Sequence, residues 1–214
     1  MVADNNIANR FKNIIESTCR LMYQRIENEI GFTDNPILIQ ILNESNIKMT
    51  VKKILYEFVT SNRNLKDCIK ELKTVISRST QYNRDVDWSI NDLAHNIYRH
   101  YDAAYNMHLA IEFGMRFFGY QGGIIKDSRD FCVAHNNKIW SIEETKTWHL
   151  WTPSTGQYPD NYKIKSTSIY EVPNYLKYPG YDPLIDIGGY CCRHILSFVS
   201  DSLAFRERPD LRKD

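Results

Sequence analysis

The chain has 214 residues, enough for one large domain or two small ones with a buried core. Its 27 Lys and Arg residues balance 26 Asp and Glu residues, so no global field would draw the protein to nucleic acid or to an anionic membrane. Its apolar runs are far shorter than a bilayer span, and its five cysteines without a signal-like start indicate a reducing compartment. We therefore expect synthesis in a cytoplasm and no membrane segment.

The first half of the chain is expected to be helical. Apolar residues recur at steps of three and four between positions 7 and 30, which is typical of one long amphipathic helix. Further apolar stripes predict helices that begin at or near Pro36, Thr50, Asn64 and Ser89. These patterns predict a helical region over residues 1–113.

The character of the sequence changes at Gly114. Residues 117–125 mix aromatic and β-branched side chains with glycine, which favours an extended segment or the edge of a hairpin. Asp127 can cap a short helix over residues 128–135, and residues 141–144 form a capping box that opens another helix. A second module is therefore expected to start here.

The stretch from Trp151 to Pro183 contains five prolines and many tyrosines, with no readable period. Such long irregular connections are either functional or ordered by a partner. The expected fold class is α+β, mainly α, with a long irregular loop in its second module. The expected divisions are a helical region (1–113), a small C-terminal α+β module (114–200) and a charged, solvated tail (201–214).

Two short stretches far apart in the chain, residues 127–135 and 188–194, share cysteine, histidine and arginine. Residues three apart on a helix project from the same face, and residues two apart share one side of a strand. Zinc binds thiolates and imidazoles tetrahedrally, so such a site would pin the long loop at both ends. The four candidate zinc ligands are Cys132, His135, Cys192 and His194.

A metal-free polar clasp is the alternative for the same two stretches. In it an arginine binds a carboxylate of the first stretch, and the histidines bond to backbone carbonyls. Cys191 competes with Cys192 as a sulfur donor in either interpretation. The candidate clasp residues are Asp127, Arg129, Asp130, Cys191 and Arg193.

Two further interpretations involve Cys132. A disulfide to Cys191 or Cys192 would also join the stretches, but a reducing compartment disfavours it. Cys132 and His194 have the residue types of a nucleophile and its base, yet no oxyanion signature or orienting partner can be identified. The common enzyme motifs are absent from the sequence.

The order of these motifs resembles the minor head proteins of tailed bacteriophages typified by protein F of phage Mu. The likeness covers roughly residues 119–199. It rests on Tyr120 to Gly123, Asp127 to Arg129, Cys132, Lys138 to Trp140, Ser141 to Glu144 and Gly188 to His194. The chain departs from the family pattern at Asp130, where Thr is common, at Cys191, where Asn is usual, and in its longer insert.

The resemblance implies a virion structural protein rather than an enzyme. It would be present in few copies at the portal vertex and would act in head assembly or in the head–tail connection. Its implied partners are portal and capsid proteins, in a homo-oligomer or ring, with packaged DNA as a further contact. It would be made in the bacterial host cytoplasm and would end in the head or neck of the virion.

Two other functions remain open at this point. A thiol- or metal-dependent hydrolase or transferase would need a pocket that holds Cys132 with a depressed pKa. A DNA-binding module would need a local patch of cations. The candidates for that patch are Lys163, Lys165, Arg206, Arg208, Arg212 and Lys213.

Overall fold

The computed structural model describes residues 2–28, 30–31, 36–61, 64–79, 87–164, 178–189 and 192–212. Within them the fold is α+β and mainly helical, which confirms the predicted fold class. The chain divides into two compact units, unit 1 (1–109) and unit 2 (110–214). The division falls inside helix α5 (Asp87–Glu112).

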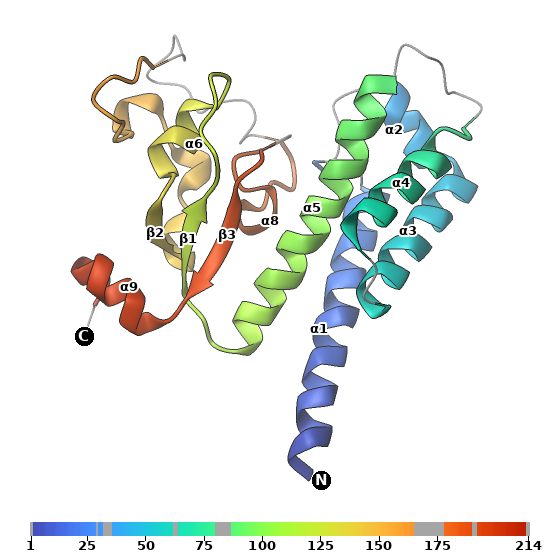
Figure 1. Ribbon diagram of the computed structural model, residues 1–214, viewed down its shortest axis with the longest axis horizontal. Helices are drawn as coiled ribbons and strands as arrows, with labels where there is room; N and C mark the ends of the chain where they lie inside the picture. The colour runs from blue at the N-terminus through green and yellow to red at the C-terminus, as the bar shows by residue number, and fades with distance from the viewer. Residues whose placement is uncertain are drawn as a thin grey trace. The chain divides into compact units, whose positions relative to one another are not determined.

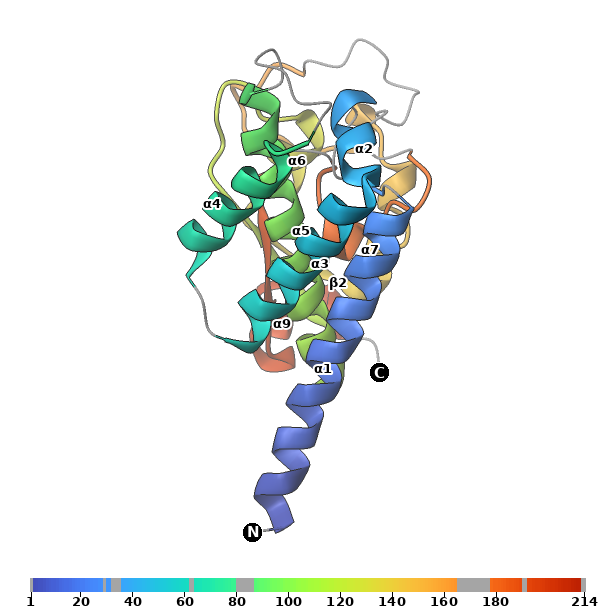
Figure 2. The same cartoon turned by 90° about the vertical axis from the view of Figure 1, so that its right-hand side faces the viewer.

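Unit 1 is built from helices. It contains α1 (Val2–Glu27), α2 (Pro36–Asn43), α3 (Ser45–Thr60), α4 (Leu65–Ile76) and most of α5. Helix α3 packs against α1, α2 and α4, and the first turns of α1 extend beyond α3 (Figures 1 and 2). The apolar stripe predicted for α1 is buried at Ile14, Met22 and Ile26, which supplies one face of the bundle core.

The helix starts in unit 1 follow local chemistry. The Asn64 side chain accepts a hydrogen bond from the Asp67 backbone N–H at 3.0 Å, so it caps α4 as its position predicts. The helix that the sequence predicts to begin at Ser89 begins at Asp87.

The described residues of unit 2 contain a three-stranded antiparallel sheet (Figure 1). Its strands are β1 (Phe117–Gln121), β2 (Lys138–Ser141) and β3 (Ile195–Val199), in the order β2-β1-β3. Gly119 pairs with Ile139 on one side and with Ser197 on the other. The sequence suggested an extended segment or the edge of a hairpin here. The extended segment is confirmed as β1, which is the central strand and is paired on both sides.

Short helices surround the sheet: α6 (Asp130–His135), α7 (Ile142–Thr145) and α8 (Pro183–Asp186). The predicted capping box of α7 is confirmed, with Ser141 and Glu144 bonding reciprocally. Asp127 does not cap α6. The Ser128 hydroxyl accepts a bond from the Ile125 N–H at 2.9 Å, so a turn occupies these positions and the helix begins later.

The described part of the connection after Trp151 is irregular apart from a 3₁₀ turn, η3 (Pro153–Thr155), which follows η2 (Trp148–Leu150). Tyr158 stacks on Tyr162, with ring centroids 5.1 Å apart. The Tyr162 hydroxyl donates to the Asp130 carboxylate at 2.6 Å. This part of the connection is therefore fastened to α6, while residues 165–177 lie outside the described residues.

Residues 201–212 do not form the expected solvated tail. They fold into α9 (Asp201–Glu207) and η5 (Pro209–Leu211). The Phe205 ring meets Phe117 edge to face at 5.4 Å. Arg208 donates to the Ile139 carbonyl at 2.8 Å and to the Glu144 carboxylate at 3.0 Å. The charge pattern indicated solvation, but this arginine uses its charge to bond the chain end to β2 and α7.

Arg208→Ala is expected to lower the free energy of unfolding of the protein by about 1–3 kcal/mol, because hydrogen bonds to a charged group are lost. Arg206→Ala is the matched control. Its exposed pair with Glu207 at 2.9 Å should contribute at most about 1 kcal/mol. Urea unfolding of both variants measures the difference, and equal effects would contradict the anchoring role of Arg208.

Candidate metal centre

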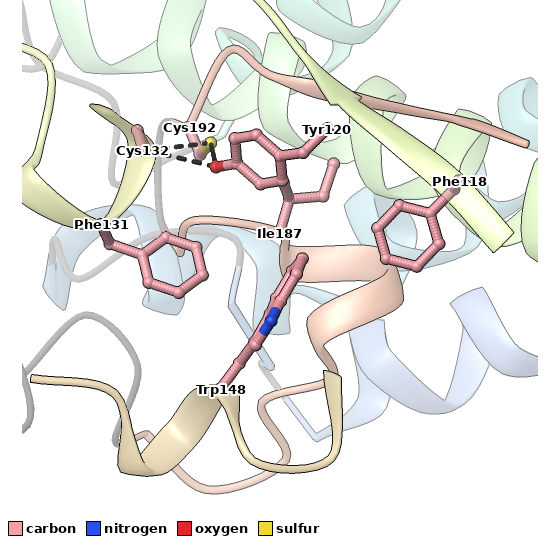
Figure 3. Close-up of a cluster of buried hydrophobic side chains, with 7 residues drawn as sticks. All are labelled: Phe118, Tyr120, Phe131, Cys132, Trp148, Ile187 and Cys192. Atoms are coloured by element: carbon pink, nitrogen blue, oxygen red, sulfur yellow. Dashed lines mark hydrogen bonds between the residues drawn. The ribbon is translucent and has the colours of Figure 1, made fainter. Parts of the chain in front are cut away.

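The core of unit 2 is aromatic and contains two sulfur atoms. Buried rings of Phe118, Tyr120, Phe131 and Trp148 meet edge to face, with centroids 5.2 to 6.1 Å apart where they contact. Figure 3 shows the cysteine side chains at one end of this cluster, beside the Tyr120 hydroxyl. Edge-to-face packing fixes ring orientation, so the donor groups around the sulfurs have defined positions.

Three of the four predicted ligands converge at this end of the core. The Sγ atoms of Cys132 and Cys192 lie 3.7 Å apart, and Cys192 Sγ lies 3.6 Å from His194 Nδ1. The donor atoms of the three residues all lie within 4.8 Å of one another, and each side chain is buried. Soft thiolates with an imidazole are the donor set that zinc prefers.

Different parts of the chain deliver these donors. Helix α6 carries Cys132, whereas Cys192 and His194 lie in the segment just before β3. The sequence suggested that the latter two share a side of a strand. They precede the strand instead, and an extended segment still directs both side chains to one place.

Tyr120 is a member of this cluster that the sequence did not identify as a site residue. Its hydroxyl donates to Cys132 Sγ at 3.3 Å and lies 3.5 Å from Cys192 Sγ (Figure 3). The Tyr120 ring also stacks on the His194 ring, with centroids 4.9 Å apart. Its sequence signals were its place in a run of apolar and glycine residues and in the Tyr120 to Gly123 motif of the family resemblance.

Two glycines allow the chain to close around the cluster. A Cβ at Gly188 would lie 2.6 Å from Cys132 Sγ and 2.8 Å from Cys192 Sγ, and one at Gly122 would lie 2.5 Å from the His194 ring. Any larger residue would displace the donors. The backbone therefore approaches the site from both sides, which only glycine permits.

Burial governs the electrostatics of the site. A hydrogen bond with Cys192 and burial raise the pKa of the Cys132 thiol well above its ordinary value, against a smaller opposite effect of Arg129. Burial likewise raises the pKa of the Tyr120 hydroxyl. Within the described residues, His194 Nε2 is buried without a hydrogen-bond partner. A divalent cation would offset the cost of burying the thiols, because it binds them as thiolates.

His135 is not part of the converging group. Its Nδ1 atom lies 2.7 Å from the Phe131 carbonyl oxygen, and its ring stacks between Phe131 and Trp140 at centroid distances of 3.8 and 4.5 Å. Burial lowers the pKa of this imidazole to about 3, so it is neutral. The prediction of His135 as a ligand is wrong, because the helix turns its ring toward the tryptophans.

The polar clasp is present in a different form. The Arg129 guanidinium donates to the Gly188 carbonyl at 3.0 Å and so joins the two stretches through backbone rather than through a carboxylate. Asp130 is buried and accepts from Tyr162, whereas Asp127 and Arg193 are exposed. Cys191 lies outside the described residues. Cys132 and Cys192 are not joined by a disulfide, since their Sγ atoms lie 3.7 Å apart.

Two cavities lined by described residues of unit 2 do not include the donor cluster in their walls. One, of about 660 Å³, is lined by Trp140, Trp148 and Trp151 with other residues. The second, of about 790 Å³, is lined by Tyr178, Tyr181 and others. Neither cavity gives a substrate access to Cys132 Sγ, which is the access that a nucleophilic cysteine would require.

Two of the four described cations of the candidate patch form ion pairs with carboxylates. Arg206 pairs with Glu207 at 2.9 Å, and Arg208 pairs with Asp210 at 2.6 Å as well as with Glu144. Lys165 and Lys213 lie outside the described residues. These ion pairs reduce the field available to a nucleic-acid backbone.

A comparison with known protein families, curated proteins and solved structures finds no match to this chain. Among the described residues, no helix combines the length and the apolar character that a membrane span requires. The chemistry of the donor cluster is therefore the main guide to function.

Gly188→Ala is expected to destabilise the protein by about 1–3 kcal/mol and to weaken metal binding, because the added methyl group overlaps both sulfurs. Gly123→Ala is the matched control, since a Cβ there meets nothing within 4 Å. Thermal unfolding and zinc titration of both variants test this. A stable Gly188→Ala variant with normal zinc binding would show that the close approach is dispensable.

Proposed function

We propose that Cys132, Cys192 and His194 hold a structural zinc ion. Zinc bonds of about 2.3 Å to sulfur and about 2.0 Å to nitrogen place tetrahedral ligand atoms about 3.5–3.8 Å apart. The separations of 3.7 Å between the sulfurs and 3.6 Å between sulfur and imidazole match this spacing. This match is the observation that carries the proposal.

The donor types favour zinc over other common cations. Calcium and magnesium take oxygen ligands, mainly carboxylates and carbonyls. The converging group consists of two thiols and an imidazole. Zinc has no redox chemistry of its own, so it suits a site whose role is to hold the chain in place.

The site supports a structural rather than a catalytic role. Catalytic zinc sites keep an open position for water or substrate. Here Cys132, Cys192 and His194 are each only 3% exposed, and neither cavity reaches them. The raised pKa of Cys132 also disfavours a nucleophilic thiolate. An enzyme acting through these residues is therefore the weaker alternative.

We further propose that the chain is a minor head component of a tailed-phage virion, acting in head assembly or at the head–tail connection. The support is the order of motifs from Tyr120 to His194 that resembles the minor head family. Those motifs include the residues of the zinc cluster, and a scaffold protein acts through surfaces that such a cluster keeps in shape. Portal or capsid proteins are the proposed partners.

The purified full-length chain is expected to contain about one zinc per molecule by elemental analysis. Removing the zinc with a chelator should lower the melting temperature, because a ligand present at 1,000 times its Kd stabilises the folded state by about 4 kcal/mol. Re-addition of zinc should restore it.

The variant Cys132→Ser combined with His194→Ala should contain no zinc and should not respond to the chelator. Cys68→Ala is the control, because Cys68 is a buried cysteine of unit 1. Its zinc content should equal that of the wild type. Metal-free wild-type protein with unchanged stability would contradict the structural zinc proposal.

The virion role predicts that particles of the phage or prophage that encodes the chain contain it in a few copies each. Quantitative mass spectrometry of purified particles measures this number against the major capsid protein. Particles assembled with the zinc-free double variant should lack the chain or be incomplete. Normal, infectious particles without the chain would refute the head-assembly role.

A further inference from the structure

The three donors of the proposed zinc site leave one tetrahedral position to be filled. Water usually fills such a position where solvent has access. The donor cluster is buried, however, and neither of the cavities described above reaches it. A protein atom close to both sulfurs is therefore the first candidate.

The Tyr120 hydroxyl oxygen lies where a fourth ligand is required. It is 3.3 Å from Cys132 Sγ and 3.5 Å from Cys192 Sγ. A tetrahedral oxygen ligand, bonded to zinc at about 2.0 Å, lies about 3.5 Å from each sulfur ligand. The hydroxyl donates to Cys132 Sγ and can accept from the Cys192 thiol, so without metal the same oxygen lies between the two sulfurs that would become ligands.

The space around Gly188 also shows how the two sulfurs and the Tyr120 oxygen are arranged. A Cβ on Gly188 would lie 2.6, 2.8 and 2.9 Å from Cys132 Sγ, Cys192 Sγ and the Tyr120 oxygen, respectively. The three atoms thus form one triangle that faces the glycine. Three vertices of a coordination tetrahedron have this arrangement, with the metal and the remaining ligand on the far side.

The Tyr120 side chain is also fixed in place. It extends from the central strand β1, is fully buried, and meets Phe131 and Trp148 edge to face while it stacks on His194. Its ring cannot turn away without disrupting this core. A preorganised donor loses little conformational entropy on binding a metal.

We propose that Tyr120 is the fourth ligand and binds the zinc ion through its phenolate oxygen. This inference rests on the proposed zinc site. Binding displaces one proton from each thiol and one from the phenol, and these protons pass to solvent. The sequence from Tyr120 to His194 then supplies a complete set of two sulfurs, one nitrogen and one oxygen.

The test is a zinc titration of the metal-free full chain, followed by ultraviolet difference spectroscopy. The wild type should develop a tyrosinate band that saturates at one zinc per chain. Tyr120→Phe should lack this band, release one proton fewer and bind zinc at least about tenfold more weakly. Tyr181→Phe is the matched control, because this nearby tyrosine donates to the Ile187 carbonyl at 2.6 Å instead. It should keep the band.

Cobalt binding separates failure of this inference from failure of the zinc site. A thiolate-to-cobalt charge-transfer band in wild type, Tyr120→Phe and Tyr181→Phe would establish that the cysteines bind metal. If that band appears and zinc produces no tyrosinate band in the wild type, Tyr120 is not a ligand, whatever its effect on affinity. If the wild type shows no thiolate band, the zinc site itself is refuted.

Discussion

The fold of unit 2 depends on a cluster of two sulfurs, one imidazole and one phenol that packs against the backbone of Gly188. Cys132 and Cys192 are 60 residues apart in the chain, yet their sulfurs lie 3.7 Å apart. Closing a loop of this length has an entropic cost that weak contacts between short helices do not easily offset. The Arg129 bond to the Gly188 carbonyl offsets part of this cost, and the proposed zinc site would offset more of it at the same point.

The rest of the unit is arranged around that point. Strand β1 carries Tyr120 into the cluster and pairs with β2 and β3, so the sheet and the donor site share one strand. The aromatic core excludes water from the sulfurs, and Arg208 bonds the chain end to the outer strand β2.

The sequence predicted that Cys132, Cys192 and His194 belong to one site. It could do so because soft donors are rare, and their clustering in two short stretches indicates a common site. It failed for His135, since spacing along a helix shows which residues share a face but not where that face points. Tyr120 and Gly188 were missed as site residues for a related reason. Their roles arise only when a strand and a loop meet, and neither residue type marks a site on its own. The charge pattern after residue 200 was similarly ambiguous, because Arg208 is solvated or bonded depending on what lies near it.

The donor cluster is buried, and its burial restricts where on the protein a partner can bind. Residues as buried as Cys132, Cys192 and His194 act on the protein mainly through its shape, so we expect recognition to occur on surfaces that the cluster supports. The segment between Cys132 and Cys192 contains β2, α7, η2, η3 and α8, and it contributes nearly all of the walls of both cavities. Fastening the two ends of this segment restricts the conformations that its surface can adopt. A partner that binds this surface then pays less of the ordering cost, which is the advantage that a rigid scaffold has over a flexible loop.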